Sequence, residues 1–293
     1  MAEPIVEAAP AKINLALHVT GRRPDGYHSI ESLVVFTRFG DRLLVEEADS
    51  DTFTVAGRYA ADVPTDGGNL VLKARDALRT ALPHASARVS IRLEKNLLVA
   101  SGIGGGSSDA AATLRGLAKL WDIDAGDDRL IDIGATLGAD VPMCLAARPL
   151  IAKGIGDEIE PVSGCLPLGL VLVNPGVAVS TPEVFAALTK RDNDGLPPLP
   201  KRIDFHSLRD WLESTRNDLE DAATALQSAI SHARAALMRA DAGFARMSGS
   251  GATCFGLFET GNVAKRAAQA IRAKHPDWFV AATRSMGSED VDD

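Results

Sequence analysis

ASGIGGGSSDAAATLRGLAKLW, residues 100–121, sets four glycines directly before an alanine-rich helical pattern. Glycine loses more conformational entropy on folding than any other residue, whereas alanine is the best helix former. The first N–H groups of a helix lack partners within the helix, and the helix dipole adds positive potential at the same end. Glycines there let a phosphate approach the main chain closely. The stretch therefore predicts a loop that binds a polyphosphate.

The spacing within this loop differs from two common phosphate-binding motifs. No Gly-Lys-Ser/Thr follows, so it is not a Walker A loop. The dinucleotide fingerprint would need a glycine at position 107, where Ser107 stands. The alternative is a tight turn packed against another element, which four glycines within five residues before an uninterrupted helix disfavour. The predicted phosphate-binding residues are Gly102, Gly104, Gly105, Gly106, Ser107 and Ser108.

The composition is that of a globular protein, because 46% of the 293 residues are hydrophobic and 24% are charged. The formal net charge of −8 argues against nucleic-acid binding, since duplex-binding proteins usually show a basic surface. The three cysteines lack metal-binding spacing, so we expect them to be reduced and buried. The sequence shows neither a secretion signal nor the ~18 uncharged apolar residues of a membrane span. We therefore expect a cytoplasmic protein without a membrane partner, and the oligomeric state stays open.

Strand-like and helical patterns mix along the chain without the regular spacing of βαβ units, which predicts an α+β fold. Apolar residues at helical spacing predict helices over 70–81 and 110–121. Glycines and prolines crowd together around residue 160, and a buried-type strand restarts after them. We place a domain boundary there, which predicts one domain over residues 1–160 and another over residues 161–293.

Three further places carry polar groups suited to chemistry, and each has an ordinary explanation when taken alone. Lys12 and Asn14 lie two residues apart on one face of a predicted strand, where a lysine commonly faces solvent. Asp140 follows a predicted helix, where an aspartate commonly bonds to the backbone of its own turn. Gly249, Ser250 and Gly251 form a glycine-rich stretch of the kind that commonly makes a hairpin turn.

In this order and at these distances, the strand of Lys12, the glycine loop and the turn at 249–251 resemble the three motifs of the GHMP kinase superfamily. PDGYH and GADVP narrow the resemblance to members that act on a cytidine-diphosphate-linked methylerythritol. NPGVAVSTPEVF and RNDLE support it, and it runs from about Ala9 to the final strand. One departure is Leu98, where the family has a proline that would stiffen the approach to the loop.

The resemblance implies a two-domain fold, with an N-terminal domain like domain 2 of ribosomal protein S5 and a ferredoxin-like C-terminal domain. It implies transfer of a phosphoryl group from ATP, with Mg²⁺, to the 2-hydroxyl of that small-molecule substrate. Asp140 is then the catalytic base and Lys12 its partner. An alcohol is a weak nucleophile, so a carboxylate that accepts its proton fits the reaction. A lysine can stabilise the charge of the transition state and keep the carboxylate ionised.

The resemblance also implies contacts to both substrates. Tyr27 and Phe185 are expected to stack on the cytosine, and His28 is expected to bond to its edge. Asn14 and Thr181 are expected to contact the methylerythritol or the diphosphate. The remaining implied residues are Asn69 and Lys95 near the adenine, Ser108 as a Mg²⁺ ligand, and Gly249, Ser250 and Gly251 as structural support for the phosphate loop.

Two other functions remain as alternatives. A different kinase of the superfamily, such as a mevalonate or homoserine kinase, has no use for a cytosine pocket, so Tyr27, His28 and Phe185 argue against it. A non-catalytic nucleotide-binding or RNA-binding protein on an S5-like fold is opposed by the acidic balance and by the presence of both Lys12 and Asp140.

Overall fold

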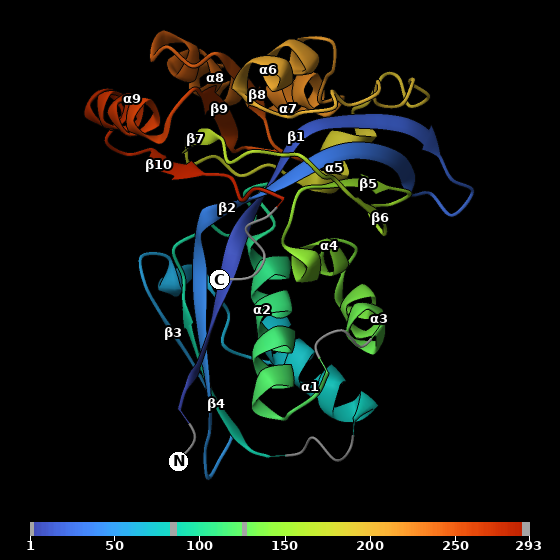
Figure 1. The fold of residues 1–293 in the computed structure, drawn as a ribbon, viewed down its shortest axis with the longest axis vertical. Coiled ribbons are helices and arrows are strands. Elements are labelled where there is room, and N and C mark those ends of the chain that lie inside the picture. The colour runs from blue at the N-terminus through green and yellow to red at the C-terminus, as the bar shows by residue number, and fades with distance from the viewer. Residues whose placement is uncertain (1–2, 83–86, 125–127, 289–293) are drawn as a thin grey trace. The chain divides into compact units, whose positions relative to one another are not determined.

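The computed structural model describes residues 3–82, 87–124 and 128–288, and the chain divides into two compact units (Figure 1). Unit 1 comprises Met1–Ala11, Gly40–Val99 and Gly104–Ala146, and unit 2 comprises Lys12–Phe39, Ala100–Ile103 and Ala147–Asp293. The long strands β1 (Ile5–Arg22) and β2 (His28–Glu47) contribute residues to both units. The units therefore interleave in sequence instead of meeting at one boundary, and the division at residue 160 stays a prediction.

Unit 1 packs helices against strands of a six-stranded sheet. Its elements are β3 (Thr52–Ala56), η1 (Ala60–Asp62), α1 (Leu70–Ala81), β4 (Val89–Glu94), α2 (Gly105–Leu120), α3 (Asp128–Leu137) and α4 (Val141–Ala146). β2 pairs antiparallel with β4, and β3 pairs parallel with β4. α1 and α2 pack against each other, and Figure 1 shows both along one face of the sheet. The bounds of α1 confirm the predicted helix over 70–81.

Unit 2 contains an antiparallel sheet with helices packed on it. Its elements are β5 (Leu150–Lys153), β6 (Glu158–Pro161), β7 (Gly169–Asn174), α5 (Thr181–Ala186), α6 (Phe205–Glu213), α7 (Glu220–Leu226), α8 (Ala229–Arg239), β8 (Phe244–Met247), β9 (Cys254–Phe258), α9 (Gly261–Lys274) and β10 (Phe279–Arg284). β5 pairs with β6 and with residues 32–34 of β2. The other four strands form the antiparallel sheet in the order β10-β7-β9-β8, and α8 and α9 pack against them. Along the chain this is the βαββαβ arrangement of a ferredoxin-like domain, which confirms that part of the predicted fold.

Two expectations from the composition are met in the described part of the chain. None of its helices combines the length and the hydropathy needed to cross a membrane. Cys144, Cys165 and Cys254 are buried and reduced. Burial raises the pKa of the Cys165 thiol to about 11, so this group stays protonated and unreactive near neutral pH.

Candidate active site

The glycine loop leads directly into α2. Gly104 is the N-cap of this helix and has a φ of 66°, a left-handed conformation that favours glycine. Among the described residues no side chain caps α2. The N–H of Ser108 bonds to the carbonyl of Gly104 at 2.9 Å, so the preceding N–H groups have no partner inside the helix. The start of α2 can therefore hold an anion on main-chain donors.

Gly102 has a different structural reason to be glycine. Its φ is 78°, and a Cβ built on it would lie 2.6 Å from the carbonyl oxygen of Gly251 and 2.7 Å from that of Ser248. Both distances are far shorter than real Cβ contacts, so no larger residue fits. Within unit 2, Gly102 is thus in direct contact with Ser248 and Gly251.

Ser248 joins the turn at 249–251 to β1, and sequence reasoning missed it. Its hydroxyl accepts the N–H of Asn14 at 3.0 Å and donates to the carbonyl of Gly102 at 3.1 Å. The N–H of Lys12 donates to the carbonyl of Ile103 at 2.9 Å. The main chain at Lys12 and Asn14 is therefore held against the loop and the turn.

The side chain of Asn14 carries an unsatisfied acceptor. Asn14 is only 3% exposed, and its Nδ2 donates to the hydroxyl of Ser32 at 2.7 Å. Its Oδ1 is buried and has no hydrogen-bond partner in the described part of the chain. Such buried acceptors are uncommon in native proteins, so this oxygen suits a donor on a bound ligand.

The structure gives Lys95 partners that the sequence did not predict. Its buried Nζ lies 2.6 Å from Oδ2 of Asp41 and 2.5 Å from Oδ2 of Asp109. A Cβ on Gly105 would meet this Nζ at 3.3 Å, so the ammonium packs against the first turn of α2. Burial raises the pKa of Asp109, and the charge of Asp41 raises it further, against the lowering effect of Lys95. The ammonium thus bonds to two carboxyl groups, and the expected adenine contact of Lys95 stays a prediction.

Asn69 caps helix α1. Its side chain accepts the N–H of Val71 at 2.8 Å, and its Nδ2 donates to the carbonyl of Pro64 at 2.7 Å. Both ends of the carboxamide are therefore bonded within the chain, and the expected adenine contact of Asn69 also stays a prediction. Asp140, in the same unit, is half-buried at the start of α4, where its carbonyl accepts the N–H of Cys144 at 3.1 Å.

Four of the predicted substrate-binding residues line one cavity of about 590 Å³ in unit 2. They are Tyr27, His28, Thr181 and Phe185, and the cavity also contains Arg22 and Arg191. The hydroxyl of Thr181 lies 2.7 Å from that of Ser250, which links this cavity to the glycine turn.

The rings in this cavity are arranged differently from the predicted sandwich. His28 stacks on Phe185, with ring centroids 4.9 Å apart and planes at 22°, while Tyr27 is 63% exposed. Burial lowers the pKa of His28, and the charges of Arg191 and Arg22 lower it further. Nε2 of His28 is buried without a hydrogen-bond partner among the described residues. A neutral His28 therefore presents an unused ring nitrogen beside an aromatic face.

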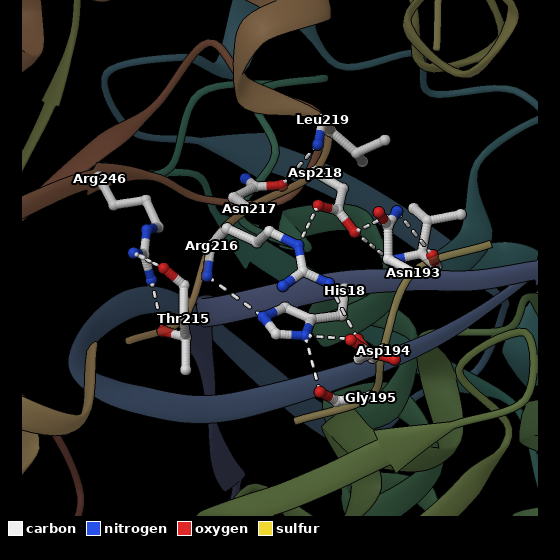
Figure 2. A network of polar contacts seen from close by, with 11 residues as sticks. His18, Asn193, Asp194, Gly195, Thr215, Arg216, Asn217, Asp218, Leu219 and Arg246 are labelled. Atoms are coloured by element: carbon white, nitrogen blue, oxygen red, sulfur yellow. Dashed lines mark hydrogen bonds and ion pairs between the residues drawn. The ribbon is translucent and has the colours of Figure 1, made fainter. Parts of the chain in front are cut away.

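His18 on β1 forms hydrogen bonds with two other segments of unit 2, at residues 194–195 and at residue 216 (Figure 2). Its Nδ1 lies 3.0 Å from the carbonyl of Asp194 and 3.1 Å from that of Gly195. Its Nε2 accepts the main-chain N–H of Arg216 at 3.2 Å. Two carbonyls around Nδ1 require a proton there, and the N–H at Nε2 requires a lone pair, so His18 is neutral with Nδ1 protonated. Burial lowers its pKa in agreement with this state.

We expect a His18→Gln variant to be less sensitive to acid than the wild type. Because the pKa of His18 is lowered in the fold, its contribution to stability is present above the unfolded pKa of about 6.5 and is lost as the pH falls through the folded value. Urea unfolding near neutral pH and at about pH 5 measures the free energy of unfolding. Between the two pH values the wild type should lose more unfolding free energy than His18→Gln. Equal losses in the two proteins would contradict a neutral His18.

Comparisons with known proteins identify relatives that match nearly the full length of the chain. Family models described as "GHMP kinases N terminal domain" and "GHMP kinases C terminal" match residues 69–148 and 197–277. The chain is 70% identical over 282 residues to a 4-diphosphocytidyl-2-C-methyl-D-erythritol kinase from Mesorhizobium japonicum, and the match covers 96% of each chain. It is 53% identical over 288 residues to a protein of the same name from Brucella melitensis, covering 97% of this chain and 96% of that one.

Solved structures give the same relationship. A crystal structure of 4-(cytidine 5'-diphospho)-2C-methyl-D-erythritol kinase superposes with a TM-score of 0.79 at 33% identity, covering 97% of this chain and 100% of that chain. A homoserine kinase from Cytophaga hutchinsonii superposes with a TM-score of 0.70 at 16% identity, covering 98% of this chain and 96% of that one. At that identity the second likeness concerns the fold alone.

Proposed function

The chain belongs to the GHMP kinases and, among them, to the 4-diphosphocytidyl-2-C-methyl-D-erythritol kinases, and from this premise we propose how its residues carry out the reaction. It is an ATP-dependent small-molecule kinase. The 2-hydroxyl oxygen of 4-diphosphocytidyl-2-C-methyl-D-erythritol attacks the γ-phosphorus of ATP, the bond to the leaving ADP oxygen breaks, and the hydroxyl proton passes to Asp140. The products are the 2-phosphate and ADP, as in the methylerythritol phosphate pathway of isoprenoid biosynthesis.

The observation that carries the proposal is the start of α2. Gly104 begins this helix in a left-handed conformation, and among the described residues no side chain caps it. Main-chain N–H groups that face a phosphate are fixed by the fold, so they need no reorganisation when charge develops in the transition state. Gly105, Gly106 and Ser107 supply these donors to the phosphates of ATP.

Lys12 and Asp140 act on the transferring group and on the acceptor. Phosphoryl transfer has a loose transition state with charge spread over the transferring oxygens, so positioning and positive charge do most of the catalysis. Lys12 supplies that positive charge from a buried position on β1. Asp140 accepts the proton that the alcohol loses, a contribution of about 10²–10⁴-fold for a well-placed general base.

Ser108 fits a role beside the metal. Its hydroxyl is fully buried at the start of α2 and has no hydrogen-bond partner among the described residues. Mg²⁺ is usually bound by phosphate oxygens, waters and one or two protein groups. No cluster of three or more metal-binding side chains occurs in the described part of the chain. When bound, Mg²⁺ neutralises charge on the phosphate oxygens.

The cavity with His28 and Phe185 is the proposed cytosine site. The cytosine stacks on the aromatic faces there, which is worth about 1–3 kcal/mol for each base in nucleic-acid complexes. The unused Nε2 of neutral His28 bonds to the polar edge of the base. Asn14 offers its unpaired Oδ1 to a hydroxyl of the methylerythritol, and Thr181 lies between the cavity and the glycine turn.

An ADP-release assay with a set of acceptors tests this function. We expect rapid turnover with 4-diphosphocytidyl-2-C-methyl-D-erythritol and none above background with mevalonate or homoserine. Methylerythritol 4-phosphate is the matched control, because it offers the same 2-hydroxyl without the cytidylyl group. Equal kcat/KM for the full substrate and this control would contradict the cytosine site, and turnover of mevalonate would favour the alternative kinase.

A further inference from the structure

Asn217 uses its whole carboxamide inside unit 2. Its Nδ2 donates to the carbonyls of Met247 and Gly249, both at 2.9 Å, and its Oδ1 accepts the N–H of Leu219 at 3.0 Å. Asn217 is only 6% exposed, so water does not replace these bonds. The two carbonyls belong to the residues on either side of Ser248, and one side chain therefore holds the 247–248 and 249–250 peptide groups of this turn.

Segment 215–219 is itself held beside β1. The N–H of Leu17 donates to the carbonyl of Arg216, and the N–H of Asp218 donates to the carbonyl of Leu17, both at 2.9 Å. Figure 2 shows Asn217 next to Asp218 in this segment. Oδ2 of Asp218 accepts the N–H of Val19 at 2.6 Å. Asn217 therefore projects from a firmly anchored backbone and does not move with the turn that it binds.

Ser248 connects the anchored Asn217 to residues of the proposed active site. Its hydroxyl has one proton, which it donates to Gly102, and it accepts the N–H of Asn14. Asn14 carries the oxygen proposed to bind substrate, and Gly102 precedes Gly104, the N-cap of α2, by two residues. A displacement of Ser248 therefore changes both places together.

We propose that Asn217 is a positioning residue for phosphoryl transfer, acting through Ser248 on Asn14 and on the glycine loop. The inference rests on the proposed function of that loop and of Asn14. Asn217 touches neither substrate in this proposal. Its effect arises because a catalytic group displaced by about 1 Å can lose about 10²-fold in rate.

The test compares Asn217→Ala with Asn193→Ala in steady-state kinetics. Asn193 is the matched control, because its Nδ2 donates to Val19 and Asp218 in the same network but not to the turn at 247–249. We expect both variants to lower Tm. Asn217→Ala should also lower kcat/KM for ATP by about 10–100-fold, while Asn193→Ala stays within about threefold of the wild type.

A double-mutant cycle with Ser248→Ala separates positioning from general loss of stability. If Asn217 acts through Ser248, the free-energy effects of the two substitutions are not additive. The double variant should then have nearly the same kcat/KM as the less active of the two single variants. Asn217→Asp keeps the shape of the side chain and the acceptor for the N–H of Leu219, but an ionised carboxylate has no donor for the two carbonyls. It should therefore lower kcat/KM about as much as Asn217→Ala, and it keeps the test readable if the alanine variant does not fold. The inference would be overturned if the losses of kcat/KM in the two single variants multiply in the double variant. It would also be overturned if Asn217→Ala has the same kcat/KM as Asn193→Ala. An active Asp140 variant would overturn the proposed base and leave this cycle readable.

Discussion

An Asp140→Asn variant is expected to lose about 10²–10⁴-fold in kcat and to bind ATP as tightly as the wild type. The change keeps the shape of the side chain and removes the carboxylate proposed to accept the proton of the acceptor alcohol. In the proposed site the phosphates of ATP are held by main-chain donors at the start of α2, which the substitution does not touch. Single-turnover ADP release measures the chemical step, and calorimetry measures ATP binding.

Asp132→Asn is the matched control for this experiment. Asp132 is exposed on α3 in the same unit, so its substitution makes the same change of charge away from the proposed chemistry. It should leave kcat unchanged. Wild-type turnover in Asp140→Asn would rule out Asp140 as the base, and loss of ATP binding together with kcat would assign Asp140 to nucleotide binding instead.

The glycine loop was predictable because its signal is local. A run of glycines directly before an alanine-rich helix leaves few structural explanations, and Gly104 does begin α2 without a side-chain cap among the described residues. Helix α6 was equally readable and was missed. Asp204 accepts the N–H of Ser207 and the Ser207 hydroxyl accepts the N–H of Asp204, a capping box that the sequence displays.

Long-range partners could not be read from the sequence. Nothing near Lys95 indicates that its ammonium would bond to Asp41, which lies 54 residues away along the chain. The stacking of His28 on Phe185 joins residues that are far apart in the same way. Asn217 stands in RNDLE, a stretch that supported the family resemblance, but only the structure gives it contacts with the turn at 247–249.

The interleaving of the two units has a related cause. A change in glycine and proline content indicates where the composition of the chain changes. It does not reveal that one strand has residues in both compact units. β1 has 18 residues and β2 has 20, well above the usual strand length of about 5–6 residues. The alternation of apolar residues indicates strand and gives no sign of where the neighbours of that strand change.

A Lys95→Met variant is expected to lose about 3–5 kcal/mol of unfolding free energy, the usual effect of removing one partner from a buried ion pair. Methionine fills a similar volume, so the loss comes from charge and not from a cavity. The carboxyl groups of Asp41 and Asp109 stay buried, and Oδ1 of Asp109 already has no hydrogen-bond partner among the described residues. Urea unfolding monitored by circular dichroism measures the loss.

The pH dependence of Lys95→Met distinguishes this electrostatic explanation from a packing defect. Burial already raises the pKa of Asp109 in the wild type, and loss of the neighbouring ammonium raises it further. A carboxyl group with a raised pKa stabilises the fold at low pH and loses that contribution as the pH rises through the folded value. Because the pKa of Asp109 is raised to about 8 in the wild type, the group is protonated in both folded proteins below that value, and the loss of unfolding free energy caused by Lys95→Met should be nearly constant from about pH 5 to about pH 7. The loss should grow above about pH 8, where the wild-type carboxyl group ionises beside Lys95 and that of the variant stays protonated. Adding Asp109→Asn should remove most of this growth, since asparagine does not ionise, whereas a deficit that stays constant with pH in both variants would show that Lys95 acts through packing alone.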